Sequence, residues 1–471
     1  MRYVSTRGEA VPLGFVEATL AGLAEDGGLY VPAAWPRIER DVIAGFAGRP
    51  YAEVAVEIVR PFIGGAIPDH DLARMAREAY SNFRHPAVSP LVQFGVNDFL
   101  LELFHGPTLA FKDVAMQLVA RLIDYVLAAR GERITMIVAT SGDTGAAAIE
   151  AFRGRSRVDL FVLFPHGRIS DVQRRMMTTA DDDNVHVFAV EGTFDDCQAL
   201  VKGMFNHPVF RSRTRLAGVN SINWARIIAQ IVYYFTAAVA LGSPLRKVAF
   251  TVPTGNFGDV YAGYVALRMG LLIDRLVIAT NVNDILARTI ATGGYDVRDV
   301  TQTSSPSMDI QVASNFERLL FEAYGRDPQA VRTLMRTLAQ SRGFTLSARA
   351  LSEIRATFSA DRADEDETAA TMRTVLRETG QLIDPHTAVA IAVSEKETRD
   401  PSVPMVVLAT AHAAKFPDAV QAACGVRPSL PEWLADLNER PERMIRFPVD
   451  QTAFEAHILS KSRAAQSGAA A

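Results

Sequence analysis

The chain has 471 residues, of which 49% are hydrophobic, and its formal net charge at pH 7 is −4. At about 100–200 residues per domain, this length predicts roughly two to four domains with large buried cores. The small negative charge excludes an overall basic field for binding nucleic acid. The two cysteines, Cys197 and Cys424, are too few for a disulfide framework and for a four-cysteine metal site.

The sequence shows no sign of a secretory or membrane segment. Residues 1–14 lack the apolar core of a signal peptide. The longest apolar run, residues 227–241, is interrupted by Gln230 and is shorter than the roughly 18 apolar residues that a membrane span needs. We therefore expect a soluble, cytoplasmic protein with no membrane partner.

The first 96 residues differ in pattern from the rest. They are mostly helical in character, with turns at residues 26–28 (Asp-Gly-Gly) and in the proline-bounded stretch 32–36. We interpret residues 1–96 as an N-terminal subdomain. At the other end, the small and polar residues 461–471 predict a frayed tail.

From about residue 97 the pattern alternates between short apolar runs, typical of buried strands, and longer runs typical of helices. Near-continuous apolar strands bury both faces, so they predict parallel, helix-covered sheets and an open α/β architecture. The predicted strands are residues 134–139, 160–164, 185–190, 248–252, 276–279 and 405–409, and the predicted helices are residues 114–130, 145–152, 196–205, 224–241 and 260–269.

A single lysine, Lys112, follows the sequence TLAF at residues 108–111 and precedes the first of these long helices. A lysine that forms an imine needs its neutral amine, and apolar surroundings lower its pKa because they disfavour the ammonium. The alternative interpretation is a solvated surface lysine, which is the commoner place for a charged residue.

A first strand–turn–helix junction occupies residues 140–145 (TSGDTG). It precedes an alanine-rich helix, and a helix N-terminus offers unpaired N–H groups and partial positive charge to an anion. The hydroxyls of Thr140, Ser141 and Thr144 suit a carboxylate, and the two glycines allow close approach of the backbone. A plain helix N-cap explains the same residue types, so both interpretations stay open.

A second junction occupies residues 253–259 (PTGNFGD), where successive N–H groups from Gly255 to Gly258 are arranged to wrap a phosphate. The turn matches neither G-x-G-x-x-G nor a Walker sequence, which excludes dinucleotide and P-loop sites. One lysine with two anion-binding turns is the minimal set for an enzyme that uses pyridoxal phosphate (PLP).

Two further polar segments adjoin predicted elements. Thr410 follows the strand at residues 405–409, and ligands of open α/β sheets bind beyond the carboxyl ends of strands. Residues 220–226 (NSINWAR) place Ser221 and Arg226 at a helix start, where an arginine suits an oxyanion. A helix N-cap is the alternative for Thr410, and an exposed charge is the alternative for Arg226.

Two other kinds of catalytic centre are not indicated. No pair of histidines has metal-ligand spacing such as H-E-x-x-H, so we expect no metal site. No G-x-S-x-G elbow occurs, which argues against a serine hydrolase.

In their order along the chain, these motifs resemble those of the threonine synthase family, in its long-chain branch, which comprises fold-type II PLP enzymes. The resemblance implies two open, mostly parallel, helix-covered sheets, with a smaller domain over residues 97–215 that carries the cofactor lysine. A larger domain over residues 216–460 would carry the phosphate-binding turn. The resemblance covers most of the chain and involves residues 22–32, 105–113, 140–145, 220–226, 255–259, 280–284, 384–386 and 411–416.

The resemblance also implies the reaction, in which O-phospho-L-homoserine and water give L-threonine and phosphate, the last step of threonine biosynthesis. For the cofactor, it implies that PLP is held covalently by Lys112, by Gly255, Asn256, Phe257 and Gly258 at its phosphate, by Thr410 at its pyridine nitrogen, and by Asp143 beside its 3-oxygen. For the substrate, it implies Thr140, Ser141 and Thr144 at the carboxylate, and Ser221, Arg226 and Lys415 at the phosphate.

Asp143 departs from the shorter members of the family, which have asparagine at this position. An ionised carboxylate beside a phenolate-like oxygen is repelled, so Asp143 either points away or shares a proton there. The long-chain branch is similar to this sequence at the position, so the departure does not imply loss of activity.

Two rival functions stay open. One is a related PLP lyase, such as a serine or threonine dehydratase, against which residues 220–226 and the N-terminal extension argue. The other is a non-catalytic homologue that acts as a binding or regulatory protein, against which Lys112 and the two turns argue. The oligomeric state is left between a monomer and a homodimer.

Overall fold

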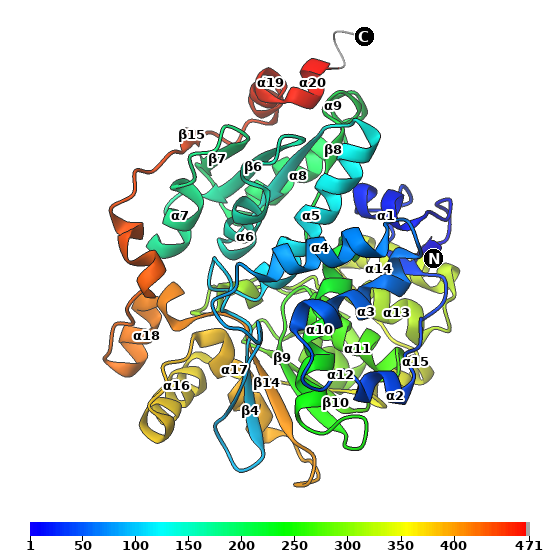
Figure 1. Cartoon of the computed structure of the whole chain (residues 1–471), viewed down its shortest axis with the longest axis vertical. Helices are drawn as coiled ribbons and strands as arrows, with labels where there is room; N and C mark the ends of the chain where they lie inside the picture. The colour runs from blue at the N-terminus through cyan, green and yellow to red at the C-terminus, as the bar shows by residue number, and fades with distance from the viewer. Residues whose placement is uncertain (468–471) are drawn as a thin grey trace.

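Two mostly parallel sheets organise the chain, and the structure, a computed structural model, describes residues 1–467 (Figure 1). In the larger sheet, with strand order β13-β10-β9-β14-β4-β3, only β3 is antiparallel to its neighbour. The smaller sheet, with order β15-β7-β6-β5-β8, is parallel throughout. The larger sheet comprises β13 (Phe358–Arg362), β10 (Ile273–Thr280), β9 (Val248–Pro253), β14 (Met405–Ala409), β4 (Asp98–Glu102) and β3 (Leu91–Gln93), and the smaller comprises β15 (Ile445–Phe447), β7 (Val185–Val190), β6 (Val158–Pro165), β5 (Ile134–Ala139) and β8 (Leu216–Ala217).

The six predicted strands are all present in these sheets, so the prediction of an open α/β fold is confirmed. The reason is visible in β6 and β14, in which every residue is buried. A strand that is covered by helices on both faces has no solvated side, and its sequence is therefore apolar throughout.

The five predicted helices are also present, but four of them begin two residues earlier than predicted, and in three of these the new first residue belongs to a motif. Lys112, Asp143 and Gly258 are consequently the first residues of helices, where unpaired N–H groups and the positive end of the dipole lie. The five are α5 (Lys112–Arg130), α6 (Asp143–Phe152), α8 (Phe194–Phe205), α10 (Trp224–Ala240) and α11 (Gly258–Arg268).

Helices cover both faces of both sheets. On the larger sheet, α17 (Pro385–Lys396) packs across β9, β10 and β14, while α11 contacts β9 and β10. On the smaller sheet, α6 and α8 both contact β5 and β6. Further helices complete these layers: α7 (Asp171–Thr178), α9 (Pro208–Thr214), α12 (Ile285–Thr292), α13 (Phe316–Ala323), α14 (Pro328–Ser341), α15 (Ala348–Arg355), α16 (Glu365–Thr379) and α18 (Pro417–Cys424).

The N-terminal segment is mostly helical, as predicted, with one small antiparallel sheet of β1 and β2. Its helices α3 and α4 contact α10 and α5 respectively, so the segment packs on the same layer that carries Lys112 (Figure 1). The elements are β1 (Tyr3–Ser5), α1 (Phe15–Ala21), β2 (Tyr30–Pro32), α2 (Arg40–Ala44), α3 (Tyr51–Ile63) and α4 (Asp69–Tyr80).

The two sheets exchange strands across the boundaries expected at residues 97 and 216. Strand β4 lies in the larger sheet although it begins at Asp98, and β8 and β15 both lie in the smaller sheet. The chain therefore passes between the two sheets more than once, and the sites at the ends of their strands are built from distant parts of the sequence.

The expected frayed tail is corrected for residues 461–467. After α19 (Gln451–Lys461), a short helix α20 (Arg463–Ser467) packs against the smaller sheet. Arg463 Nε lies 2.7 Å from Asp159 Oδ1, and the hydroxyls of Ser462 and Thr135 lie 2.7 Å apart. These buried polar partners order a segment whose composition alone predicts fraying; residues 468–471 lie outside the described part of the chain.

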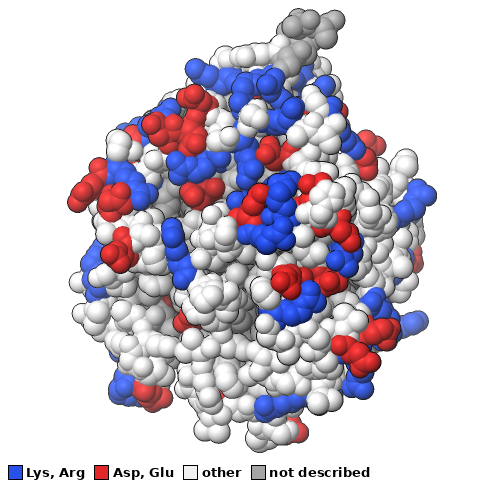
Figure 2. Space-filling view, viewed as in Figure 1, with Lys and Arg blue, Asp and Glu red and all other residues white. Residues whose placement is uncertain are grey.

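Charge is interspersed over the face seen in Figure 2, where Lys and Arg alternate with Asp and Glu, and the lower part of this face carries few charged side chains. Within residues 1–467, no helix combines the length and apolarity that crossing a bilayer requires.

Candidate active site

Lys112 lies where the start of α5 meets the end of β14. The backbone N–H of Phe111 donates to the carbonyl of Thr410 at 2.9 Å, which ties the two segments together. The lysine side chain is buried, and its Nζ lies 3.1 Å from Asp143 Oδ2. Burial lowers the pKa of Lys112 although Asp143 opposes this effect. The structure thus presents an amine that loses its proton readily, as covalent chemistry requires.

Asp143 is ionised and lies between two lysines. Its Oδ1 lies 2.8 Å from Lys415 Nζ and accepts a hydrogen bond from Gln173 Nε2 at 2.9 Å. Burial raises the pKa of Asp143, but the ammonium groups of Lys112 and Lys415 outweigh it and hold the pKa well below its ordinary value. Lys415 is fully buried and also donates to the carbonyl of Thr108 at 2.7 Å.

In the turn at residues 140–145, the hydroxyl of Thr140 binds backbone N–H groups of the turn itself. Thr140 Oγ1 accepts hydrogen bonds from the N–H groups of Gly142 and Gly145, both at 2.9 Å. The N–H groups of Ser141 and Thr144 donate to no acceptor within residues 1–467, and both side chains are partly exposed. The turn therefore keeps two backbone donors for an anion, while Thr140 supports the turn itself.

The turn between β9 and α11 is a cradle of unpaired donors. Among the residues described, the N–H groups of Gly255, Asn256 and Phe257 donate to no acceptor. Phe257 has a φ of +67°, and the carbonyl of Asn256 accepts from Asn315 N and Nδ2, both at 3.0 Å. A Cβ added at Gly255 would lie 2.4 Å from the carbonyl oxygen of Ser307. The N–H groups and the required glycine fit a phosphate group.

Arg226, in the first turn of α10, is a buried cation without a carboxylate partner in the part of the chain that the structure describes. Its Nη1 donates to the carbonyl of Val219 at 3.3 Å, and its Nε has no hydrogen-bond partner. Burial lowers the pKa of Arg226 to about 10. Such a group is costly unless an anion joins it, so its presence indicates an anionic ligand.

Ser221 and Thr410 also adjoin this region. Ser221 Cβ lies 3.9 Å from a Cβ built at Gly258, which places Ser221 against the turn of unpaired donors. Thr410 is buried, and within residues 1–467 its hydroxyl forms no hydrogen bond.

Two residues that support Asp143, Gln173 and Ser307, were missed by the sequence analysis. Gln173 holds Asp143, as described above, and Ser307 Oγ approaches Asp143 Oδ2 at 3.4 Å. The N–H of Ser307 donates to His386 Nε2 at 3.2 Å, while His386 Nδ1 bonds Asp384 Oδ2 at 2.6 Å. His386 therefore carries its proton on Nδ1. Only Asp384 and His386 belonged to a motif quoted above; Gln173 and Ser307 carried no signal.

Comparisons with known proteins are consistent with this geometry. Family models described as "Threonine synthase N terminus", "Pyridoxal-phosphate dependent enzyme" and "Threonine synthase, C-terminal" match residues 2–80, 89–356 and 387–458. The chain is 51% identical to a threonine synthase of Pseudomonas aeruginosa, with 97% of this chain and 98% of that protein covered.

Two solved structures extend the likeness to the fold. The crystal structure of PLP-bound threonine synthase from Brucella melitensis superposes with a TM-score of 0.96 at 60% identity, covering 98% of this chain and 100% of that chain. Threonine synthase from yeast superposes with a TM-score of 0.92 at 38% identity, covering 98% of both chains.

Proposed function

This chain belongs to the threonine synthase family and is a PLP-dependent lyase, and we propose that it converts O-phospho-L-homoserine and water into L-threonine and phosphate. The proposal rests on the buried guanidinium of Arg226, which has no carboxylate partner among the residues described and is close enough to Lys112 to affect its pKa. The substrate of a serine or threonine dehydratase has no phosphate to bind such a cation.

The residues of the site fit PLP. We propose that Lys112 holds the cofactor covalently and that the unpaired N–H groups at Gly255, Asn256 and Phe257, with Gly258, hold its phosphate. Thr410 would hydrogen-bond the pyridine nitrogen through its hydroxyl, and Asp143 would lie beside the 3-oxygen. Bound PLP supplies an electron sink for the charge that develops at the substrate α carbon.

The chain's own groups perform the remaining tasks. The free N–H groups at Ser141 and Thr144, on a turn that Thr140 supports, would bind the substrate carboxylate. Ser221 and Arg226 would hold the substrate phosphate. The Lys112 amine would take the proton from Cα as a general base, which its lowered pKa favours. Water is needed only for the final addition at Cβ, so we expect closure of the cleft before that step.

The sequence predicts that Lys415 binds the substrate phosphate, but a second role is also possible for this lysine. Its ammonium already contacts the Asp143 carboxylate and the Thr108 carbonyl. We therefore propose that Lys415 mainly balances the charge of Asp143, so that this carboxylate is tolerated beside the cofactor oxygen.

We further propose a cytoplasmic protein that is a monomer or homodimer. The segments 1–96, 97–215 and 216–460 would serve as N-terminal subdomain, lysine-bearing domain and phosphate-turn domain.

One assay separates this function from its rivals. Phosphate release from O-phospho-L-homoserine should be rapid, while ketoacid formation from L-threonine should be slow by comparison. The opposite ratio would identify a dehydratase, and the absence of both reactions in a PLP-loaded protein would identify a non-catalytic homologue.

We expect Arg226→Ala to raise the KM for O-phospho-L-homoserine by about 10- to 100-fold, because hydrogen bonds to charged groups contribute about 1.5–3 kcal/mol. Steady-state phosphate release measures the change. The variant should stay folded, since the Arg226 side chain makes a single hydrogen bond within residues 1–467. Arg213→Ala, which removes an exposed guanidinium from α9, is the control. An unchanged KM in Arg226→Ala would remove this residue from the phosphate site.

We expect Gly255→Ala to weaken PLP binding by about tenfold or more, because the added methyl would lie 2.4 Å from the Ser307 carbonyl and displace the turn. Absorbance titration of the cofactor-free protein with PLP measures the affinity. Gly258→Ala is the matched comparison, since a Cβ there meets its nearest neighbour at 3.4 Å and fits. Equal losses in the two variants would contradict the proposed cradle geometry.

A further inference from the structure

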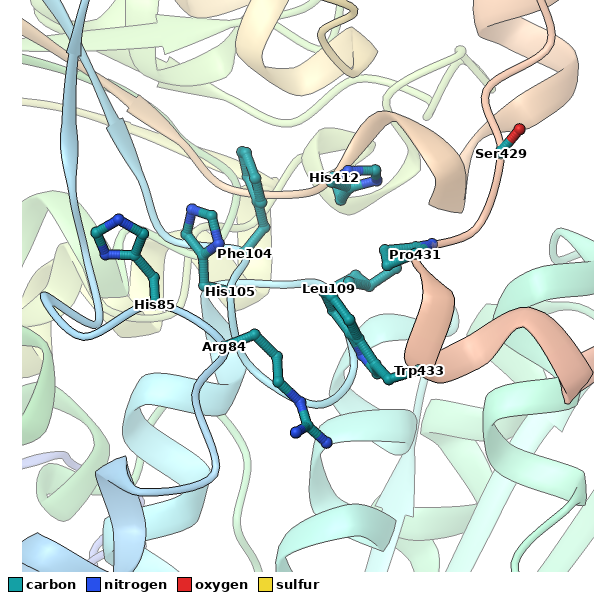
Figure 3. Close-up of a pocket in the computed structure, with 9 residues that line it drawn as sticks. All are labelled: Arg84, His85, Phe104, His105, Leu109, His412, Ser429, Pro431 and Trp433. Carbon is teal, nitrogen blue, oxygen red and sulfur yellow. The ribbon is translucent and has the colours of Figure 1, made fainter.

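A cavity of about 360 Å³ lies near the proposed cofactor site but is not lined by Lys112. Figure 3 shows that its lining comes from separate segments, with Arg84 on a loop, Trp433 on a short helix and His412 on a third segment. A smaller cavity of about 260 Å³ shares Phe104, His105 and His412 with it. The larger volume falls within the range of about 300–1,000 Å³ that is typical of small-molecule sites.

A wall of two paired segments separates this cavity from Lys112. The N–H of His412 donates to the carbonyl of Leu109 at 3.0 Å, and Ala110 pairs with Ala411 as an isolated bridge. Lys112 lines neither cavity. Ala409, Ala411 and His412 line the smaller one, whereas Thr410 does not. The smaller cavity therefore lies on the side of this segment away from the Thr410 side chain, and the larger cavity adjoins it at His412.

The Arg84, His85 and His412 side chains face the larger cavity as donors, and the Ser429 hydroxyl can also accept. Arg84 is an exposed residue whose guanidinium lies over the Trp433 ring at 5.6 Å and has no ion pair or side-chain hydrogen bond within residues 1–467. His85 Nδ1 accepts from Ala87 N, and His412 Nδ1 accepts from Ala414 N, both at 3.1 Å. Each imidazole consequently carries a proton on Nε2.

The carboxylate of Glu102, in the neighbouring smaller cavity, is already engaged. Glu102 Oε2 lies 2.7 Å from His105 Nε2, and Glu102 lines only the smaller cavity. Burial lowers the pKa of His412, which makes its imidazole a neutral donor. Arg84 is then the one permanent cation among the nine residues that line the larger cavity, which matches a ligand with a single negative charge.

The other residues that line the larger cavity suit a ligand with a flat, apolar ring. Trp433, Pro431 and Leu109 contribute apolar surface, and the Phe104 ring packs edge-on against His412 at 5.2 Å between centroids. We propose that this cavity binds an aromatic monocarboxylate, with its carboxylate at Arg84 and its ring against Trp433. Arginine provides the planar fork that a carboxylate takes, and aromatic walls favour a ring over an aliphatic body.

Trp433 allows the proposal to be tested by fluorescence on the PLP-loaded protein. The other two tryptophans, Trp35 and Trp224, lie together in a different core with ring centroids 6.1 Å apart. Titration with benzoate should quench the emission saturably, and Trp433→Phe should remove this quenching. Acetate, which lacks the ring, and benzyl alcohol, which lacks the charge, should each bind at least tenfold more weakly than benzoate.

Arg84→Ala should weaken benzoate binding at least tenfold, and Arg349→Ala, which removes an exposed guanidinium from α15, should leave it unchanged. Isothermal titration calorimetry repeats the comparison without relying on fluorescence. Quenching that is not saturable, or that persists in Trp433→Phe, would overturn the proposal. Equal affinity of Arg84→Ala and the unaltered protein would overturn it as well.

Discussion

Replacement of Lys112 by alanine should lower turnover of O-phospho-L-homoserine by at least about 10⁴-fold. A positioned general base contributes about 10²–10⁴ to a rate, and this variant also loses the covalent attachment of PLP. The fold should survive, because Asp143 keeps Lys415 as an ion-pair partner at 2.8 Å. Loss of phosphate release in a folded variant would thus report the chemistry of Lys112 and not a collapse of the site.

The attachment is measured separately from activity. Borohydride reduction of the PLP-loaded protein, followed by digestion and mass spectrometry, should find the adduct on the peptide that contains Lys112. Lys202→Ala, which removes an exposed lysine of α8, is the matched control and should keep both the adduct and the turnover. An adduct on another lysine, or normal turnover by Lys112→Ala, would refute the assignment.

The central strands were predictable because a strand that is buried on both faces has a continuous run of apolar residues. Three of the strands that were missed lie at sheet edges and lack such a run. In β13 (Phe358–Arg362) only the first residue is buried, and β8 has two residues. In β15 (Ile445–Phe447) no residue is buried. Edge strands of this kind form because a neighbouring strand offers hydrogen bonds, which is a tertiary cause that local patterning does not record.

The junctions of the site were predictable for a similar local reason. Glycine and helix-capping residues after a strand predict a turn that leads into a helix. Both turns lie where the sequence predicts them. The positive φ of Phe257 was not foreseeable, because phenylalanine rarely adopts it. It is held by the surrounding backbone, including the carbonyl of Asn256 that Asn315 binds.

Contacts between segments that are distant in the sequence could not be predicted from it. Asp143 meets Gln173, Ser307 and Lys415, which come from α7, from the short 3-10 helix η1 (Pro306–Met308), and from the segment after β14. No periodicity brings such residues together, since their proximity follows from the packing of two sheets. The sequence therefore indicated Lys112 and the two turns as candidate site residues but not the charge balance around them.

That balance has a consequence for Asp143, which neutralises one of two buried lysines and contacts both. Asp143→Asn should destabilise the protein by about 3–5 kcal/mol, because it leaves buried ammonium groups without a counter-charge. The double variant Asp143→Asn/Lys415→Met removes one charge of each sign and should recover much of this loss. Urea unfolding of the unaltered protein, of Asp143→Asn, of Lys415→Met and of the double variant, all without PLP, measures the coupling free energy between the two residues.

The coupling free energy should reach about 1–3 kcal/mol, the range found for residues in direct contact within one network. The ion pair of Lys247 and Asp274, at 3.3 Å and partly exposed, is the control and should couple by less than about 1 kcal/mol. Additive losses at Asp143 and Lys415 would mean that the second lysine does not balance the carboxylate. A coupling well above that of the exposed pair would explain how this site keeps an ionised aspartate beside Lys112.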